Sequence, residues 1–257
     1  MLANYHTHTY RCNHAVGTDR EYVEKAIERG LKTLGFSDHV HMPFPDGHEP
    51  WNRVPLWLLE DYVNSVLALR QAYKDDIDIR LGFEAEYYPD LFEAMLEVLG
   101  PYPVDYLLLA QHFNDSRETV YNPSMAQDKA ALRRYVDRVI EGMETGAFTY
   151  VAHPDLFYFN GSERVYRREM GRLCQRAKEL DIPLEINMLG LRTGRCYPND
   201  WFWPIVKEQG CRAVLGCDAH DPRDVAEPEQ LKRAMDYAAR FGITPEEIIA
   251  LKKPNQP

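Results

Sequence analysis

The chain has 257 residues, of which 45% are hydrophobic and 27% are charged, and its formal net charge is −10. This composition is typical of a globular protein with a large core, and a chain of this length can fold as one barrel, so we expect a single domain over residues 1–257. The acidic balance argues against broad contact with nucleic acid or an anionic membrane surface.

The protein is expected to be cytoplasmic. No apolar run reaches the ~20 residues that span a bilayer, and the first residues lack the pattern of a signal peptide. The five cysteines are odd in number and have no Cys-x-x-Cys spacing, which argues against a disulfide framework and a zinc ribbon. No cysteine is assigned a role, and the sequence does not indicate an oligomeric state.

Seven short apolar runs alternate with amphipathic segments along the chain. Strands are predicted at residues 2–6, 33–37, 77–84, 105–110, 148–152, 183–187 and 213–217. Helices are predicted at residues 21–29, 56–73, 91–99, 128–145, 165–180, 200–209 and 228–241. This alternation predicts an α/β fold with a parallel sheet and outer helices, which is either a closed barrel or an open doubly wound sheet.

Residues of the types that bind metal ions follow these strands. His6 and His8 end the first strand on the same face, because alternate residues of a strand share a face. In a closed barrel the carboxyl ends of all strands meet at one mouth, whereas an open sheet spreads them along a line. No glycine-rich phosphate loop follows the first strand, so we predict the barrel. The candidate metal ligands are His6, His8, His14, His39, Glu84, His112, His153, Asp218 and His220.

Imidazole nitrogens and carboxylate oxygens suit zinc, manganese or iron. Nine such residues exceed what one ion can use, so the sequence predicts two or three divalent ions with a carboxylate such as Glu84 bridging a pair. The irregular stretch 42–55 contains four prolines and Trp51 and follows the second strand. It is therefore expected at the mouth of the barrel, as a candidate lid.

The order of these ligand residues resembles that of the PHP (polymerase and histidinol phosphatase) superfamily. Similarity to PHP-type histidinol-phosphatases extends over the local sequences at 5–15, 35–39, 82–87, 111–113, 152–155, 185–187 and 190–192. The resemblance implies a distorted (β/α)7 TIM-like barrel and a trinuclear metal centre held by all nine residues. In one departure, Met188 and Leu189 stand where a small polar pair is expected before Gly190.

The resemblance also implies a phosphomonoesterase acting on a small phosphorylated substrate, with L-histidinol phosphate and water giving L-histidinol and phosphate. Clustered metal ions would neutralise the phosphate charge and lower the pKa of a bridging water, which then attacks phosphorus. Asp218, His153 and His220 are alternative donors of the proton to the leaving group. Candidate phosphate ligands are Arg192, Arg195 and Arg117, and the carboxylates expected to orient the histidines are Asp38, Glu86 and Asp155.

Other functions stay open at this stage. The same centre could serve another small phosphomonoester, phosphotyrosine or a phosphodiester, as in an exonuclease, although the acidic composition argues against a nucleic-acid substrate. An amidohydrolase is disfavoured because no lysine stands at a strand end to become a carboxylated ligand. A barrel that binds metal without catalysis is the non-enzymatic alternative.

Overall fold

The computed structural model describes residues 1–124 and 127–254. Its centre is a sheet of seven parallel strands, each paired with its neighbours in chain order. The strands are β1 (Ala3–Asn4), β2 (Thr33–His39), β3 (Asp78–Ala85), β4 (Tyr106–Leu109), β5 (Tyr150–Val151), β6 (Leu184–Asn187) and β7 (Ala213–Gly216). Every predicted strand is present, but β1 and β5 have only two residues each and are shorter than expected.

The sheet closes between its first and last strands. Thr7 forms a parallel bridge with Ala219. The His8 amide donates to the Ala219 carbonyl at 2.9 Å, and the Ala219 amide donates to the His6 carbonyl at 3.3 Å. These bonds lie at the carboxyl ends of β1 and β7, and they confirm the predicted (β/α)7 barrel.

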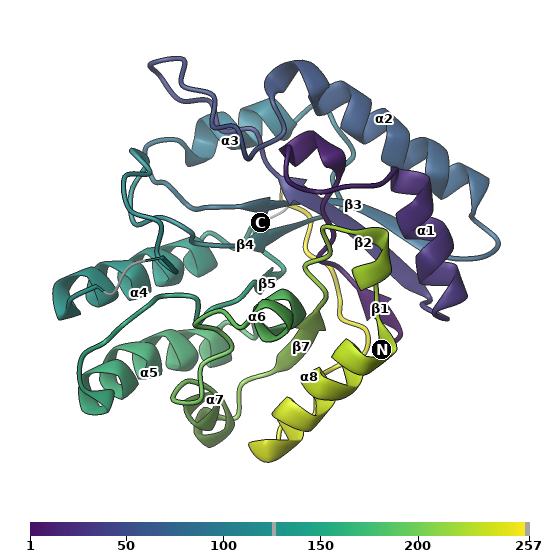
Figure 1. Cartoon of the computed structure of the whole chain (residues 1–257). Helices are drawn as coiled ribbons and strands as arrows, with labels where there is room; N and C mark the ends of the chain where they lie inside the picture. Colours follow the sequence, from purple (N-terminus) through teal and green to yellow (C-terminus); the bar gives the residue numbers. More distant parts are fainter. Residues whose placement is uncertain (125–126, 255–257) are drawn as a thin grey trace.

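Helices surround the strands (Figure 1). They are α1 (Asp19–Glu28), α2 (Leu56–Ala72), α3 (Phe92–Leu99), α4 (Lys129–Glu144), α5 (Glu163–Glu179), α6 (Met188–Thr193), α7 (Trp203–Gln209) and α8 (Pro228–Arg240). Two 3-10 turns, η1 (Tyr10–Cys12) and η2 (Pro222–Asp224), complete the elements. Within the described ranges, no helix has the length and apolar character needed to cross a bilayer.

The helix α6 was not predicted, because six residues are too few to show a helical period. It begins directly after β6, where the Asn187 side chain accepts a hydrogen bond from the Gly190 amide at 2.8 Å. This N-cap turns the chain sharply at the mouth of the barrel.

Side chains alternate between the two faces of each strand. Leu81, Phe83 and Leu107 pack outward against the helices, whereas Tyr106 packs inside the barrel in a separate apolar cluster. A Cβ atom on Gly82 would come within 2.4 Å of the Tyr106 ring, so glycine is needed there for the ring to lie across the interior. Apolar side chains thus fill the barrel interior away from the carboxyl ends of the strands, and polar side chains occupy the inward positions at those ends.

Candidate metal centre

Every second residue of a strand points into the barrel, and at the carboxyl ends of the strands these inward positions hold the predicted ligands. His39 and Glu84 are register partners on β2 and β3. His112 stays in phase with the inward residue Tyr106 of β4. His153 has φ 30° and Asp218 has φ 47°, both in the left-handed region, so the chain turns sharply where β5 and β7 end.

Glu84 is the centre of the cluster. Its side chain is 1% exposed, and five imidazoles surround its two oxygens. The nitrogen-to-oxygen distances are 2.8 Å to His153, 3.1 Å to His39, 3.4 Å to His6, 3.4 Å to His8 and 3.8 Å to His112. One carboxylate within reach of this many imidazoles is suited to bridging two cations.

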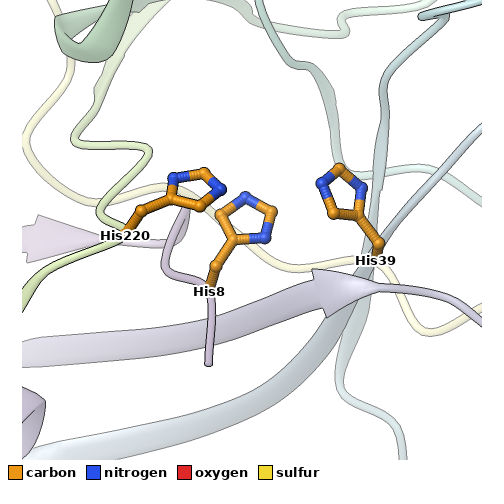
Figure 2. A group of neighbouring side chains, drawn as sticks. All are labelled: His8, His39 and His220. Atoms are coloured by element: carbon orange, nitrogen blue, oxygen red, sulfur yellow. The ribbon is translucent and has the colours of Figure 1, made fainter. Parts of the chain in front are cut away.

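Asp218 forms a second carboxylate centre, which approaches the same Nε2 atoms of His6 and His8 as Glu84 does. Its Oδ1 lies 3.2 Å from His8 Nε2, 3.5 Å from His6 Nε2 and 3.4 Å from His220 Nδ1. The His8 ring lies between the rings of His220 and His39 (Figure 2), with centroid separations of 4.1 Å and 4.6 Å.

His14 completes the group. Its ring centroid lies 4.6 Å from that of His220 and 5.4 Å from that of His39. The structure therefore brings all nine predicted residues into one cluster. Cys12 lies at its edge, with Sγ 4.0 Å from His14 Nε2, and burial raises the pKa of this thiol to about 11.

The electrostatics of the cluster suit a bound cation. Burial alone would raise the pKa of Glu84, but the neighbouring histidines outweigh it and hold this pKa well below its usual value; the same holds for Asp218. Burial lowers the pKa of His39 and His220 well below the usual value. Burial would also lower the pKa of His6 and His8, but the neighbouring carboxylates outweigh it and raise this pKa well above the usual value. Metal ions bind anionic carboxylates and neutral imidazoles, so a bound cation would displace protons from His6 and His8.

Several buried polar atoms in the cluster have no hydrogen-bond partner among the described residues. They are His6 Nε2, both ring nitrogens of His8, Glu84 Oε2 and His153 Nδ1. Each such atom costs about 1–3 kcal/mol unless something satisfies it. The donor atoms of His6, His8 and Glu84 lie within 4.8 Å of one another, as do those of two further sets, His6–His153–Asp218 and His8–His39–His220. The residues therefore fit more than one divalent ion.

Two of the three carboxylates predicted to orient histidines lie beside a histidine. Glu86 Oε1 is 2.7 Å from His112 Nδ1. Asp38 Oδ1 is 3.5 Å from His8 Nδ1, and Asp38 Oδ2 accepts a hydrogen bond from the Thr9 amide at 3.1 Å.

Asp155 has a different role from the predicted one. Its carboxylate accepts hydrogen bonds from the Asn199 amide at 2.6 Å and from Trp203 Nε1 at 3.0 Å. The turn at His153 directs Asp155 away from the cluster, and its side chain instead holds the segment that leads into α7.

Glu185 and Asn187, which lie inward on β6, also contact the cluster and were not predicted as site residues. Glu185 Oε2 is 2.8 Å from His6 Nδ1, and Asn187 Nδ2 donates to Glu185 Oε1 at 2.7 Å and to Asp218 Oδ2 at 3.0 Å. A Cβ on Gly216 would lie 2.1 Å from the Glu185 carboxylate, so only glycine leaves room for it. The available signal was two polar residues at alternate positions of a predicted buried strand.

A cavity of about 480 Å³ opens above the cluster, within the range of small-molecule sites. Trp51 and Asn52 of the 42–55 segment lie at its edge, which is where the candidate lid was expected. Trp51 is 68% exposed, and its carbonyl accepts a hydrogen bond from Asn13 Nδ2 at 2.5 Å. The lining residues are His14, His39, Trp51, Asn52, Glu84, His112, Phe113, Tyr121, Leu189, Arg195, Tyr197, Asp218 and His220.

Among the three predicted phosphate-binding arginines, only Arg195 lines this cavity, where its Nη1 donates to the Tyr197 hydroxyl at 2.9 Å. Arg192 instead pairs with Asp224 at 2.9 Å and donates to Gln230 Oε1 at 2.9 Å. The helix α6 causes this difference, because it directs Arg192 toward α8. The Arg117 side chain is 81% exposed and is not among the lining residues.

The sequence of this barrel matches a known family over most of its length. The model of the PHP domain matches residues 4–188, which is more than half of the chain. The chain belongs to the PHP domain family. This confirms the resemblance that the ligand order indicated.

The similar proteins include two bacterial proteins whose names contain histidinol-phosphatase. The probable histidinol-phosphatase of Deinococcus radiodurans is 33% identical over 236 residues, 87% of this PHP chain and 88% of its own. The histidinol-phosphatase of Bacillus subtilis is 27% identical, over 86% of this chain and 94% of its own. The crystal structure of histidinol phosphate phosphatase from Lactococcus lactis subsp. lactis, complexed with zinc, L-histidinol and phosphate, superposes with a TM-score of 0.71 at 18% identity, covering 95% of each chain.

Proposed function

We propose that this PHP protein is a metal-dependent phosphomonoesterase and that its substrate is L-histidinol phosphate, which it hydrolyses in histidine biosynthesis. The observation that carries the proposal is the buried cluster centred on Glu84, directly below a cavity that contains one arginine. The names of the Deinococcus and Bacillus relatives support the substrate. The ligands of the Lactococcus protein support the same chemistry.

The nine clustered residues would hold two or three divalent ions, with zinc supported by the Lactococcus structure. Bound ions would supply positive charge to the phosphate oxygens and activate a water for in-line attack. Glu185 would orient His6, and Glu86 would orient His112, so that the other ring nitrogen of each faces the ions.

Arg195 is the proposed ligand of the substrate phosphate. Its guanidinium lies in the cavity wall, and the Tyr197 hydroxyl accepts one of its hydrogen bonds. The planar fork of arginine matches two phosphate oxygens. The proposed leaving group would then lie against the apolar part of the wall, which includes Phe113, Tyr121 and Leu189.

Exchanging the two neighbouring arginines for alanine separates their roles. Arg195→Ala should lower kcat/KM by about one to three decades, as expected for losing ~1.5–4 kcal/mol of charge-assisted binding, and should weaken inhibition by inorganic phosphate in parallel. Arg195→Lys should recover only part of the loss, because an ammonium lacks the planar fork. Steady-state kinetics measures both.

Arg192→Ala is the matched control, since Arg192 lies three residues away and pairs with Asp224 instead. Its kcat/KM should stay within about threefold of the wild-type value, the range of a partly exposed ion pair. The opposite pattern, a large loss in Arg192→Ala and none in Arg195→Ala, would contradict this assignment of the phosphate site.

A second candidate is a PHP phosphatase for another small monoester. It is favoured by Leu189, which lines the cavity where a small polar residue was expected. A substrate panel on metal-reconstituted protein decides between them. Hydrolysis rates for L-histidinol phosphate should exceed those for simple aliphatic monoesters, phosphotyrosine and a phosphodiester, and the reverse order would overturn the proposed substrate.

A further inference from the structure

A buried arginine lies at the end of the 42–55 segment, outside the cavity. Arg53 is 2% exposed and contacts two buried carboxylates. Its Nη1 donates to Glu86 Oε2 at 2.7 Å, and its Nη2 donates to Glu118 Oε1. The side chains of Glu86 and Glu118 are 2% and 7% exposed. A buried charge that pairs with two carboxylates fixes both partners in place.

These three residues come from different segments around the mouth. Arg53 ends the segment that supplies Trp51 to the cavity wall, and Glu86 follows β3. Glu118 belongs to the 113–124 stretch, which supplies Phe113 and Tyr121 to the wall of the same cavity. The guanidinium therefore links the 42–55 and 113–124 segments, which both line the cavity, to the residue that follows β3.

The same contacts lead to the metal centre. Glu86 Oε2 accepts a hydrogen bond from Arg53 Nη1 at 2.7 Å, and Glu86 Oε1 lies 2.7 Å from His112 Nδ1. With Oε2 held by Arg53, Oε1 faces the imidazole and its ring is fixed. The opposite nitrogen, His112 Nε2, lies 3.8 Å from Glu84 Oε1 in the cluster.

Glu118 is held from a second direction. The Tyr88 hydroxyl donates to Glu118 Oε1 at 2.8 Å, and Glu118 has φ 50°, in the left-handed region that a glutamate rarely adopts. A backbone in this conformation persists only where its surroundings hold it there. In the described structure, Arg53 and Tyr88 hold the Glu118 side chain, and the Glu118 amide donates to the Asp115 carbonyl at 3.1 Å. The Arg53 guanidinium pairs with both glutamates.

We propose that Arg53 is a positioning residue that couples the mouth of the barrel to the metal centre. It holds Glu86 against His112, and at the same time it pins the 113–124 stretch through Glu118. The inference rests on the proposed metal site, but its test does not depend on the substrate.

The test compares Arg53→Met with Arg212→Met. Arg212 also links two carboxylates from different segments, Glu246 at 2.6 Å and Asp181 at 2.9 Å, and it lies beside β7 at the amino end of the barrel. Zinc affinity is measured by competition with a chromogenic chelator, and hydrogen exchange is measured over residues 113–124. Arg53→Met should lower the affinity for the most weakly bound zinc about 10- to 100-fold, because the residue that orients a metal ligand loses its own support. It should also raise the hydrogen-exchange rate over residues 113–124. Arg212→Met should change neither.

Two milder variants keep the test decisive if Arg53→Met folds poorly. Glu118→Gln leaves the Arg53–Glu86 contact in place, so it should speed exchange over 113–124 and leave zinc affinity within about threefold of the wild type. Arg53→Lys keeps the charge but cannot reach both glutamates with a planar fork, so it should fall between the wild type and Arg53→Met in both measurements.

Unchanged zinc affinity in Arg53→Met and Arg53→Lys would overturn the proposed coupling, as would unchanged exchange over 113–124. Failure of the proposed function has a different signature. In that case the wild-type protein hydrolyses no phosphomonoester in the panel, although zinc affinity and hydrogen exchange still respond to Arg53.

Discussion

Glu84→Gln should remove nearly all activity and at least one equivalent of bound metal. The Glu84 carboxylate lies within 3.8 Å of five imidazole nitrogens, so one side chain serves most of the cluster. An amide has no negative charge and places N–H hydrogens where a cation would bind, so it cannot bridge two ions. We expect kcat/KM to fall by about three decades or more, which corresponds to ~4 kcal/mol of lost transition-state stabilisation.

The control for this change is Glu169→Gln. Glu169 is also buried, at 4% exposure, but it lies on α5 and pairs with Arg168 and Arg172 on the outer surface of that helix. This variant should keep its metal and its activity. Elemental analysis, kinetics and circular dichroism are measured for both. A Glu84→Gln protein that retains full metal content would show that Glu84 is not a bridging ligand.

The barrel and the cluster could be predicted because both follow from periodic features of the sequence. Short apolar runs alternate with amphipathic helices, and a ligand-type residue follows almost every run. Closure of a parallel barrel brings the carboxyl ends of all strands together, so residues as distant as His8 and His220 meet without any local signal linking them. His6 and His8 are two residues apart on one strand and so share a face, which was the first evidence that ligand residues point to one site.

Contacts that depend on local turns could not be predicted in the same way. Arg192 and Arg195 follow the end of β6 by five and eight residues. The six-residue helix α6 directs Arg192 toward α8 and leaves Arg195 in the cavity wall. Asp155 follows His153 by two residues, but the left-handed conformation of His153 redirects it toward Trp203. Neither feature has a periodic signature.

The contacts of Arg53 could not be predicted from the sequence either. Its partners Glu86 and Glu118 lie 33 and 65 residues away, on segments whose relative placement depends on the closed barrel. In the sequence, Arg53 is one arginine in a proline-rich loop, where a solvated side chain is the ordinary expectation. Only its burial identifies it as part of the site.

Removal of metal should lower the unfolding temperature of the wild-type protein substantially. Without cations, the cluster leaves Glu84 Oε2 and ring nitrogens of His6 and His8 buried and unpaired within the described residues. Ions that bind the native state alone stabilise it by about 4 kcal/mol when free metal is 1,000 times the dissociation constant. For a chain of this size, that corresponds to about 10 °C.

The measurement is thermal unfolding by circular dichroism, before and after dialysis against a chelator and again after zinc is restored. The unfolding temperature should fall on chelation and recover with zinc. In Glu84→Gln the difference between the two states should shrink, because the variant binds less metal, whereas Glu169→Gln should behave like the wild type. Equal unfolding temperatures for the metal-loaded and chelated wild-type protein would mean that the buried imidazoles and carboxylates stabilise one another without ions, and the cluster would then be a structural network.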